Sequence, residues 1–146
     1  MLKFYKFSIF LAILLNSTAC MAKQDKNYNI HTSVVHVLSA PEQYYDKNIL
    51  IDGFFVGYAE NNLYFSSEHA EHMLRAMGVN VLDDTEENSL SFSSCNGEWV
   101  EMWGTYISAV DQQVSYFKGR LVVDEVIIHK TGKTCWKRTE KSRLKD

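Results

Sequence analysis

The chain has 146 residues, enough for one packed domain but not for two. Apolar residues make up 46% and charged residues 23%, a composition that excludes an intrinsically disordered chain. Removal of residues 1–19 would leave 13 basic and 18 acidic side chains, a net charge of −5. Because affinity for phosphate backbones comes from Lys and Arg, we expect no nucleic-acid partner.

The N-terminus has the features of a secretory signal. Lys3 and Lys6 form a charged start, and a nine-residue stretch from Phe7 to Leu15 follows that is apolar except for Ser8. Nine residues of helix span only about 14 Å, whereas the hydrocarbon core of a membrane is roughly 30 Å thick. The segment therefore predicts an export signal over residues 1–19 and not a transmembrane anchor.

The residues Ser17-Thr18-Ala19-Cys20 resemble a lipobox, at which bacterial lipoproteins are cut before a cysteine that becomes lipid-modified. Ordinary cleavage after Ala19 or Ala22 is the alternative, and it would release a soluble protein. The three cysteines would leave one thiol exposed in an oxidising compartment unless Cys20 is acylated. We therefore predict lipidation at Cys20. The lipoprotein pattern uses Asp at the next position for inner-membrane retention, so Met21 favours the outer membrane.

The remaining chain divides into three parts. Residues 20–29 form a lipidated N-terminus with a polar tether, and residues 30–136 form the folded domain. Residues 137–146 form a tail with five basic and two acidic side chains, which we expect to be mobile. The predicted location is the bacterial cell envelope, where the lipid anchors the protein to a membrane facing the periplasm. A periplasmic or secreted protein is the alternative.

Five segments have the composition of β-strands, and the glycines inside two of them mark bulges or bends. In the fourth segment, alternate residues share one face: Val100, Met102, Gly104 and Tyr106. The predicted strands are Ile49–Tyr58, Leu63–Ser66, Ser89–Ser93, Trp99–Ser108 and Leu121–His129.

One helix is predicted between the two short strands. Ser66 or Ser67 caps its start and Gly78 ends it. Four apolar residues would fall on one face and plug the sheet: Ala70, Met73, Leu74 and Met77. Five strands with one short helix predict a mainly β protein, a small OB-like Greek-key barrel.

Two stretches resemble small bacterial OB-fold-like envelope lipoproteins of unassigned function. Residues 39–48 contain a Pro-x-x-Tyr turn that leads into the alternating strand Ile49–Phe54 with its central Gly53, and Glu101–Tyr106 resembles their later glycine-containing strand. The resemblance covers roughly residues 33–128. It implies a barrel fold and no catalytic residue.

Cys95 and Cys135 flank the last two long strands and form the predicted disulfide. The bond would close a loop of about 40 residues, which stabilises a fold by roughly 4 kcal/mol in the chain-entropy model. Small exported domains commonly depend on such bonds.

Two candidate binding sites have structural alternatives. Tyr58, Tyr64, Trp103 and Tyr106 are candidates for a ligand-binding aromatic patch, because OB barrels stack ligands on outer aromatic rings, whereas barrel packing is the alternative. His69 and His72 are three positions apart and could share a metal ion on one helix face. The alternative there is an exposed helix surface, since the sequence matches no zinc motif.

The chain contains no GxSxG, P-loop or GxGxxG pattern, so we predict a protein that is not an enzyme and needs no cofactor. The export signal and the barrel pattern predict a lipid-anchored binding module that contacts another envelope protein. The alternative is a periplasmic protein that binds a small ligand, a glycan or a metal ion.

Overall fold

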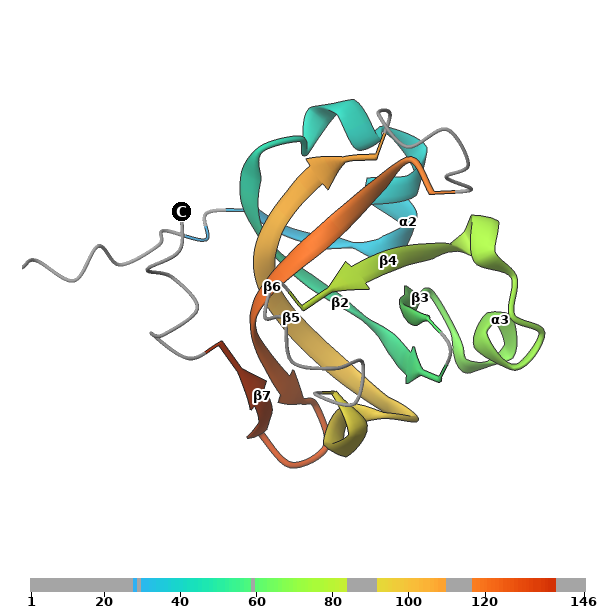
Figure 1. Cartoon of the computed structure of the whole chain (residues 1–146), viewed down its shortest axis with the longest axis vertical. Helices are drawn as coiled ribbons and strands as arrows, with labels where there is room; N and C mark the ends of the chain where they lie inside the picture. The colour runs from blue at the N-terminus through green and yellow to red at the C-terminus, as the bar shows by residue number, and fades with distance from the viewer. Residues whose placement is uncertain (1–27, 29, 59, 84–91, 110–116, 139–146) are drawn as a thin grey trace, which may run out of the picture.

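The computed structural model describes residues 28, 30–58, 60–83, 92–109 and 117–138 (Figure 1). The strands in these ranges are β1 (Ile30–Ser33), β2 (Lys47–Gly57), β3 (Asn61–Tyr64), β4 (Gly78–Leu82), β5 (Glu98–Ser108), β6 (Gly119–Ile128) and β7 (Lys133–Lys137). The helices are α2 (Val34–Ser39), α3 (Ser67–Glu71) and the 3₁₀ turns η1 (Pro41–Gln43), η2 (Arg75–Met77) and η3 (Ser93–Cys95). None of the helices in the described ranges has the length and apolar character needed to span a membrane.

Five strands close into a barrel in the order β2-β3-β4-β6-β5, and β5 returns to pair with β2. The pairings around this ring are antiparallel except for the parallel pair of β4 and β6. β1 adds to β2 in parallel, and β7 adds to β6 in antiparallel orientation. The predicted mainly β, OB-like barrel is confirmed, with two extra strands and a second short α-helix that the sequence did not predict.

Strict alternation builds β2 and β5. In β2 the buried positions are Ile49, Ile51, Gly53 and Phe55, and in β5 they are Val100, Met102, Gly104 and Tyr106. The intervening side chains point to the outer surface, as a period of two requires. The predicted inner face of β5 is therefore confirmed. The positions that alternate with the buried ones in β2 and β5 form part of the outer surface of the barrel.

At Gly104 the neighbouring strand leaves no room for a side chain. A Cβ atom at this position would lie 2.4 Å from the backbone oxygen of Val122 on β6. The register between the two strands shifts between Trp103 and Gly104, which marks a β-bulge. A bulge next to a glycine bends the paired strands, and this bend helps a five-stranded barrel to close.

The core combines barrel side chains with α2, which the sequence analysis did not predict. Val34 and Val37 of α2 are fully buried in the same cluster as the inner faces of β2 and β5. α2 contacts β4 and β1. The ring of Phe92 packs between Phe55 and Trp136, at centroid distances of 5.6 Å and 4.8 Å. The core therefore extends from the barrel interior to the strand added at its edge.

The helix after β3 is much shorter than predicted. α3 ends at Glu71, where the Met73 amide donates to the Ala70 oxygen at 3.0 Å and the Leu74 amide to the His69 oxygen at 3.1 Å. This pair of bonds is a Schellman motif, which places Met73 in the left-handed region at φ 47°. The predicted apolar helix face does not plug the sheet, because Met73, Leu74 and Met77 are exposed.

The early end of α3 follows from strand pairing. Tyr64, the last residue of β3, pairs directly with Gly78, the first residue of β4. A straight helix from Ser67 to Met77 would carry the chain about 16 Å away from that pair. The chain must return to its starting point, so the helix stops and a 3₁₀ turn follows.

The predicted strand Ser89–Ser93 is replaced by β4 as the partner of β3. Residues 89–91 lie outside the described ranges, Phe92 is in a turn, and Ser93–Cys95 form η3. The alternation of Gly78–Leu82 is short, and both sets of its side chains are largely buried, so the period-two signal is weak.

Both ends of the described chain meet at Asp124 in β6. The Tyr28 hydroxyl donates a hydrogen bond to Asp124, and Arg138 Nε lies 3.4 Å from the same carboxylate. β7 runs through Lys137, one residue beyond the predicted domain boundary at Trp136. The predicted signal over residues 1–19, Cys20, the tether except Tyr28, and tail residues 139–146 lie outside the described residues.

Candidate functional site

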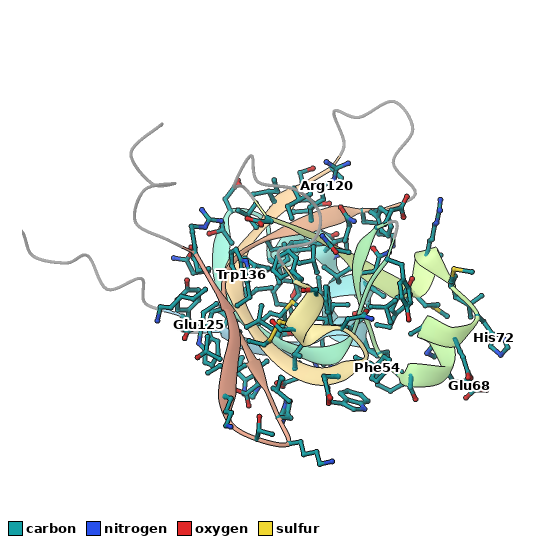
Figure 2. The ribbon with its side chains drawn as sticks, turned by 60° about the horizontal axis from the view of Figure 1, so that its bottom comes forward. Phe54, Glu68, His72, Arg120, Glu125 and Trp136 are labelled. Carbon is teal, nitrogen blue, oxygen red and sulfur yellow. A yellow bond between two sulfur atoms is a disulfide. The ribbon has the colours of Figure 1, made fainter. Side chains whose placement is uncertain are left out.

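A groove of about 550 Å³ lies between the outer side of β2 and α3. Nine residues line it: Phe54, Val56, Tyr58, Ser67, Ala70, Glu71, Met73, Asn96 and Gly97. Figure 2 shows Phe54 on the outside of the barrel next to α3, with Glu68 and His72 at the edge of the molecule beyond it. The groove therefore runs along the outer positions of one long strand and ends at a short, exposed helix.

The groove is apolar, and its walls are fixed by hydrogen bonds. Phe54 packs edge to face against Trp99 of β5, with ring centroids 6.1 Å apart. The Gly57 amide donates to Asn96 Oδ1 at 2.8 Å, and the Gly97 amide donates to the Phe55 oxygen at 2.9 Å. These bonds attach the segment before β5 to the end of β2, so this side of the groove is formed before any ligand arrives.

Two large apolar side chains project from the rim of the groove. Tyr58, just after β2, is 78% exposed, and Met73 is 72% exposed. Met73 also has the left-handed backbone conformation described above, which a residue with a Cβ atom adopts at a cost of roughly 1–2 kcal/mol. Residues that are held in a costly backbone conformation cluster at binding sites, so a strained and exposed Met73 on the groove suggests a binding role.

The four predicted aromatic ligand residues do not form one patch. Tyr58 lies on the groove, but Tyr64 and Tyr106 are buried, and Trp103 is half-buried on the outer face opposite Leu50. Burial raises the pKa of the Tyr106 phenol far above its ordinary value, and the Tyr45 phenol adds to this effect. Tyr64 and Tyr106 pack the barrel, which corrects the prediction of a surface patch.

Phe54 and Trp99 supply the outer rings that the sequence analysis did not select. Both occupy positions that alternate with core residues, Phe54 beside Phe55 and Trp99 beside Val100. The parity of each strand was therefore the signal that could have identified them. Their separation of 45 positions hides their contact in the sequence, since only the register of β2 against β5 pairs them.

The surface that OB folds most often use for ligands is covered in this protein. The second and third barrel strands, which carry that surface in OB folds, are β3 and β4 here. Asn62 and Asn80 alternate with the core residues of these strands, yet both are buried and are joined by a hydrogen bond of 3.3 Å. The outer positions of β2 and β5, in contrast, are partly exposed.

His69 and His72 lie apart from the groove floor and serve different purposes. The Nδ1 atom of His69 is 2.8 Å from Ser66 Oγ, the side chain that caps α3, and its ring packs against Phe65. His72 is exposed at the end of α3 and points away from the barrel (Figure 2). In the described part of the chain, these two histidines belong to no group of three or more metal-ligating side chains.

A different cluster of ligand-type side chains lies across the outer face of the sheet. Asp52 of β2 pairs in register with Glu101 of β5, and His129 follows the end of β6. His129 Nε2 is 3.2 Å from Asp52 Oδ1 and 3.7 Å from Glu101 Oε1. His31 of β1 contacts the other Asp52 oxygen, with its Nε2 atom 2.5 Å from Oδ2. Four side chains thus converge on the outer face of the sheet. The Asp52–Glu101 pair among them is two positions along the β2–β5 register from the Phe54–Trp99 pair.

The predicted disulfide between Cys95 and Cys135 is present. It joins η3 to β7, and the Cα atoms are 5.5 Å apart. Ser94 Oγ also donates to the Cys135 oxygen at 2.7 Å. The bond holds β7 against the turn that precedes β5, and this turn carries the groove residues Asn96 and Gly97.

Comparison with known proteins identifies no family. A scan against protein-family models matches none, and a search of curated proteins finds no match. The fold is similar to the crystal structure of a Leishmania major Friedlin chain described as an aspartyl-tRNA synthetase, with a TM-score of 0.44 and 16% identity. The match covers 80% of this chain and 23% of the synthetase, so this chain spans less than a quarter of that protein's length. A likeness this distant carries no argument about function.

Proposed function

We propose that the protein is an exported, lipid-anchored binding module of the bacterial cell envelope that contacts another envelope protein through the groove between β2 and α3. In this proposal the module is not an enzyme. The lining residues of the groove include one carboxylate, Glu71, and no His, Cys, Lys or Arg side chain.

The observation that carries the proposal is the concentration of exposed apolar side chains around this groove. Of the large apolar residues that are exposed in the described ranges, Tyr58, Met73 and Trp99 lie on or beside it, and Phe65, Leu74 and Met77 lie on the segment between β3 and β4. Contiguous exposed apolar surface on a small protein marks interaction sites. Aromatic residues and Met are also the types enriched in the centres of protein interfaces.

The partner that fits the groove presents an apolar segment with a flanking basic group. Phe54, Val56 and Ala70 offer an apolar floor, and Glu71 offers the negative charge at its margin. A protein side chain such as Leu or Phe would bury area against this floor, and a Lys or Arg beside it would pair with Glu71.

Site-directed photo-crosslinking in the native host tests the proposal. A benzophenone side chain at Tyr58 should form a specific adduct with one envelope protein, and the same group at Gln43, exposed on η1 away from the groove, should not. Met73→Gly should abolish the adduct while keeping the left-handed turn, because glycine adopts this conformation freely. Loss of the adduct in this variant therefore reports the groove and not unfolding.

Two outcomes would reject a protein partner in the groove. One is an identical adduct pattern from Tyr58 and Gln43. The other is an adduct that persists unchanged in Met73→Gly. A small ligand or glycan is the alternative occupant, because the volume of the groove is within the range of roughly 300–1,000 Å³ that such sites have. That occupant would leave the crosslinker without a protein adduct in either position.

The location is tested separately by intact mass. The protein extracted from the envelope of its host should have a mass that begins at acylated Cys20, and reduction of the Cys95–Cys135 bond should add two hydrogen atoms. A mass that corresponds to a chain with an unmodified first residue would reject the lipid anchor. The protein would then be a soluble periplasmic or secreted module.

A further inference from the structure

Three side chains of metal-ligating type gather on the outer face of the barrel. Asp52, Glu101 and His129 each offer one ligand atom, and these atoms all lie within 4.8 Å of one another. We infer that this cluster binds a divalent transition metal ion, and that Zn²⁺ is the ion it fits. The inference needs no partner protein, and it places the metal ion away from His69 and His72, the pair that the sequence suggested.

The spacing of the ligand atoms suits zinc. Zinc bonds to His nitrogen and carboxylate oxygen are about 2.0–2.2 Å long, so two donors of a tetrahedral site are roughly 3.4 Å apart. The distances from His129 Nε2 to Asp52 Oδ1 and Glu101 Oε1, 3.2 Å and 3.7 Å, lie on either side of this value. Since all three ligand atoms lie within 4.8 Å of one another, side-chain rotations would bring the three donors into coordination.

The two carboxylates of the cluster favour the binding of a cation. Two carboxylates lie side by side on neighbouring strands, and within the described ranges their ion-pair partners are His31 and His129, with no Lys or Arg among them. With neutral imidazoles the cluster carries two negative charges, which a divalent ion balances. Mixed nitrogen and oxygen donors favour Zn²⁺ over Ca²⁺ and Mg²⁺, which take oxygen ligands.

His31 has the position of an outer partner. Its Nε2 atom lies 2.5 Å from Asp52 Oδ2, while the other carboxylate oxygen, Oδ1, faces His129. Ligating carboxylates in metal sites are commonly held by such a second hydrogen bond, which fixes their orientation. His31 therefore positions Asp52 and does not need to contact the metal ion.

The backbone holds the ligands in place. Asp52 and Glu101 are directly opposite each other in the β2–β5 pairing, and the His129 amide donates to the Trp99 oxygen at 2.9 Å. Two of the ligands thus sit on adjacent, hydrogen-bonded strands, and the third follows the end of β6 and is tied to β5 by a backbone hydrogen bond. Sites built on such rigid elements keep their geometry before the metal arrives.

Metal titration of the full chain purified from its host tests the inference. Calorimetry should show one Zn²⁺ ion per chain. His129→Ala, Asp52→Asn and Glu101→Gln should each weaken binding by on the order of 100-fold, and His31→Ala by about 10-fold. The matched control is the double variant His69→Ala/His72→Ala, which should bind as tightly as the unaltered chain. Thermal unfolding of each variant checks that it is folded.

A second readout uses the unaltered chain, so it holds even if a variant fails to fold. In ¹H–¹⁵N spectra of the imidazoles, Zn²⁺ should shift the His129 Nε2 resonance and leave His72 unchanged. Equal affinity in His129→Ala, a shift confined to His69 and His72, or Ca²⁺ binding as tight as Zn²⁺ would each overturn the inference.

Discussion

Cys95 and Cys135 are 40 positions apart in the chain, yet the disulfide holds their Cα atoms 5.5 Å apart. The bond joins the turn before β5 to β7, a strand whose sheet partner is β6. Beside it, the Phe92 and Trp136 rings pack with centroids 4.8 Å apart. A covalent bond and an aromatic contact therefore hold the last strand on the barrel.

Removal of the disulfide should destabilise the fold substantially. Replacing both cysteines by Ala should lower the free energy of unfolding by about 4 kcal/mol, because the unfolded chain regains the entropy of an open loop of 40 residues. Urea unfolding followed by Trp fluorescence measures the change. A reducing agent should have the same effect on the unaltered protein and none on the variant. A change below about 1 kcal/mol would mean that Trp136 packing and the pairing with β6 hold β7 without the disulfide.

Gly104→Ala should lower the stability of the barrel through a clash with the backbone of β6. The added Cβ atom would meet the Val122 oxygen at 2.4 Å, and backbone cannot move aside as a flexible side chain can. We expect a loss of about 3 kcal/mol in the free energy of unfolding. Gly132→Ala is the matched control, because its position has open space and only a backbone φ of 64° to resist the change, worth about 1 kcal/mol. Equal losses in the two variants would contradict the predicted clash.

Met73→Gly should make the protein more stable. Glycine removes the strain of the left-handed conformation but adds entropy to the unfolded chain, so the expected net gain is about 0.5–1 kcal/mol. Met77→Gly, in η2, has no positive φ to relieve and should lose a similar amount. Chemical denaturation of the two variants compares them directly. If Met73→Gly also loses stability, the Met73 side chain contributes packing that its exposure does not suggest.

Alkaline pH should weaken the fold through Tyr106. Burial raises the pKa of this phenol above the ordinary 10.0, so the folded protein keeps a proton that the unfolded chain releases. The stabilisation is complete below pH 10, and above it the free energy of unfolding should fall by about 1.4 kcal/mol per pH unit. Burial also raises the pKa of Tyr64, although a hydrogen bond with Asn62 opposes this effect. The raised pKa of Tyr64 makes the fall in the free energy of unfolding with pH steeper.

Tyr106→Phe separates this effect from general alkaline damage. The variant should show a shallower fall in stability above pH 10, measured by urea unfolding at a series of pH values. Tyr58→Phe, which removes an exposed phenol outside the core, should follow the unaltered protein. A slope that is the same in all three proteins would exclude Tyr106 as its source.

The parts of the fold that the sequence predicted are those with a strong local signal. β2 and β5 are long and buried on one face, so each shows alternation over many residues. The disulfide was predictable because two cysteines remain when Cys20 is set aside. The fold class followed from these strands, the interior glycines and the short helix.

The remaining features depend on contacts between distant segments. The apolar repeat that predicted a helix to Gly78 is real, but pairing of Tyr64 with Gly78 decides where the helix stops. β7 is five residues long with a lysine at each end, so its composition does not predict a strand, and it is held by Trp136 and the disulfide. The cluster of Asp52, Glu101 and His129 draws its residues from β2, β5 and the turn after β6, so only the strand register reveals it.

Asp124 holds the two ends of the described fold at one side of the barrel. The Tyr28 hydroxyl and the Arg138 guanidinium both contact this carboxylate, so both ends of the fold leave the barrel from one place. The end of β7, which leads to Arg138, lies across the barrel from α3 (Figure 1). A fluorescent protein or an affinity tag joined directly to Tyr28 or to Arg138 would therefore sit at the same pole and leave Met73 unobstructed. Because Tyr28 and Arg138 lie at the same carboxylate, linking these two residues and opening the chain at the β2–β3 turn should give a circular permutant that folds.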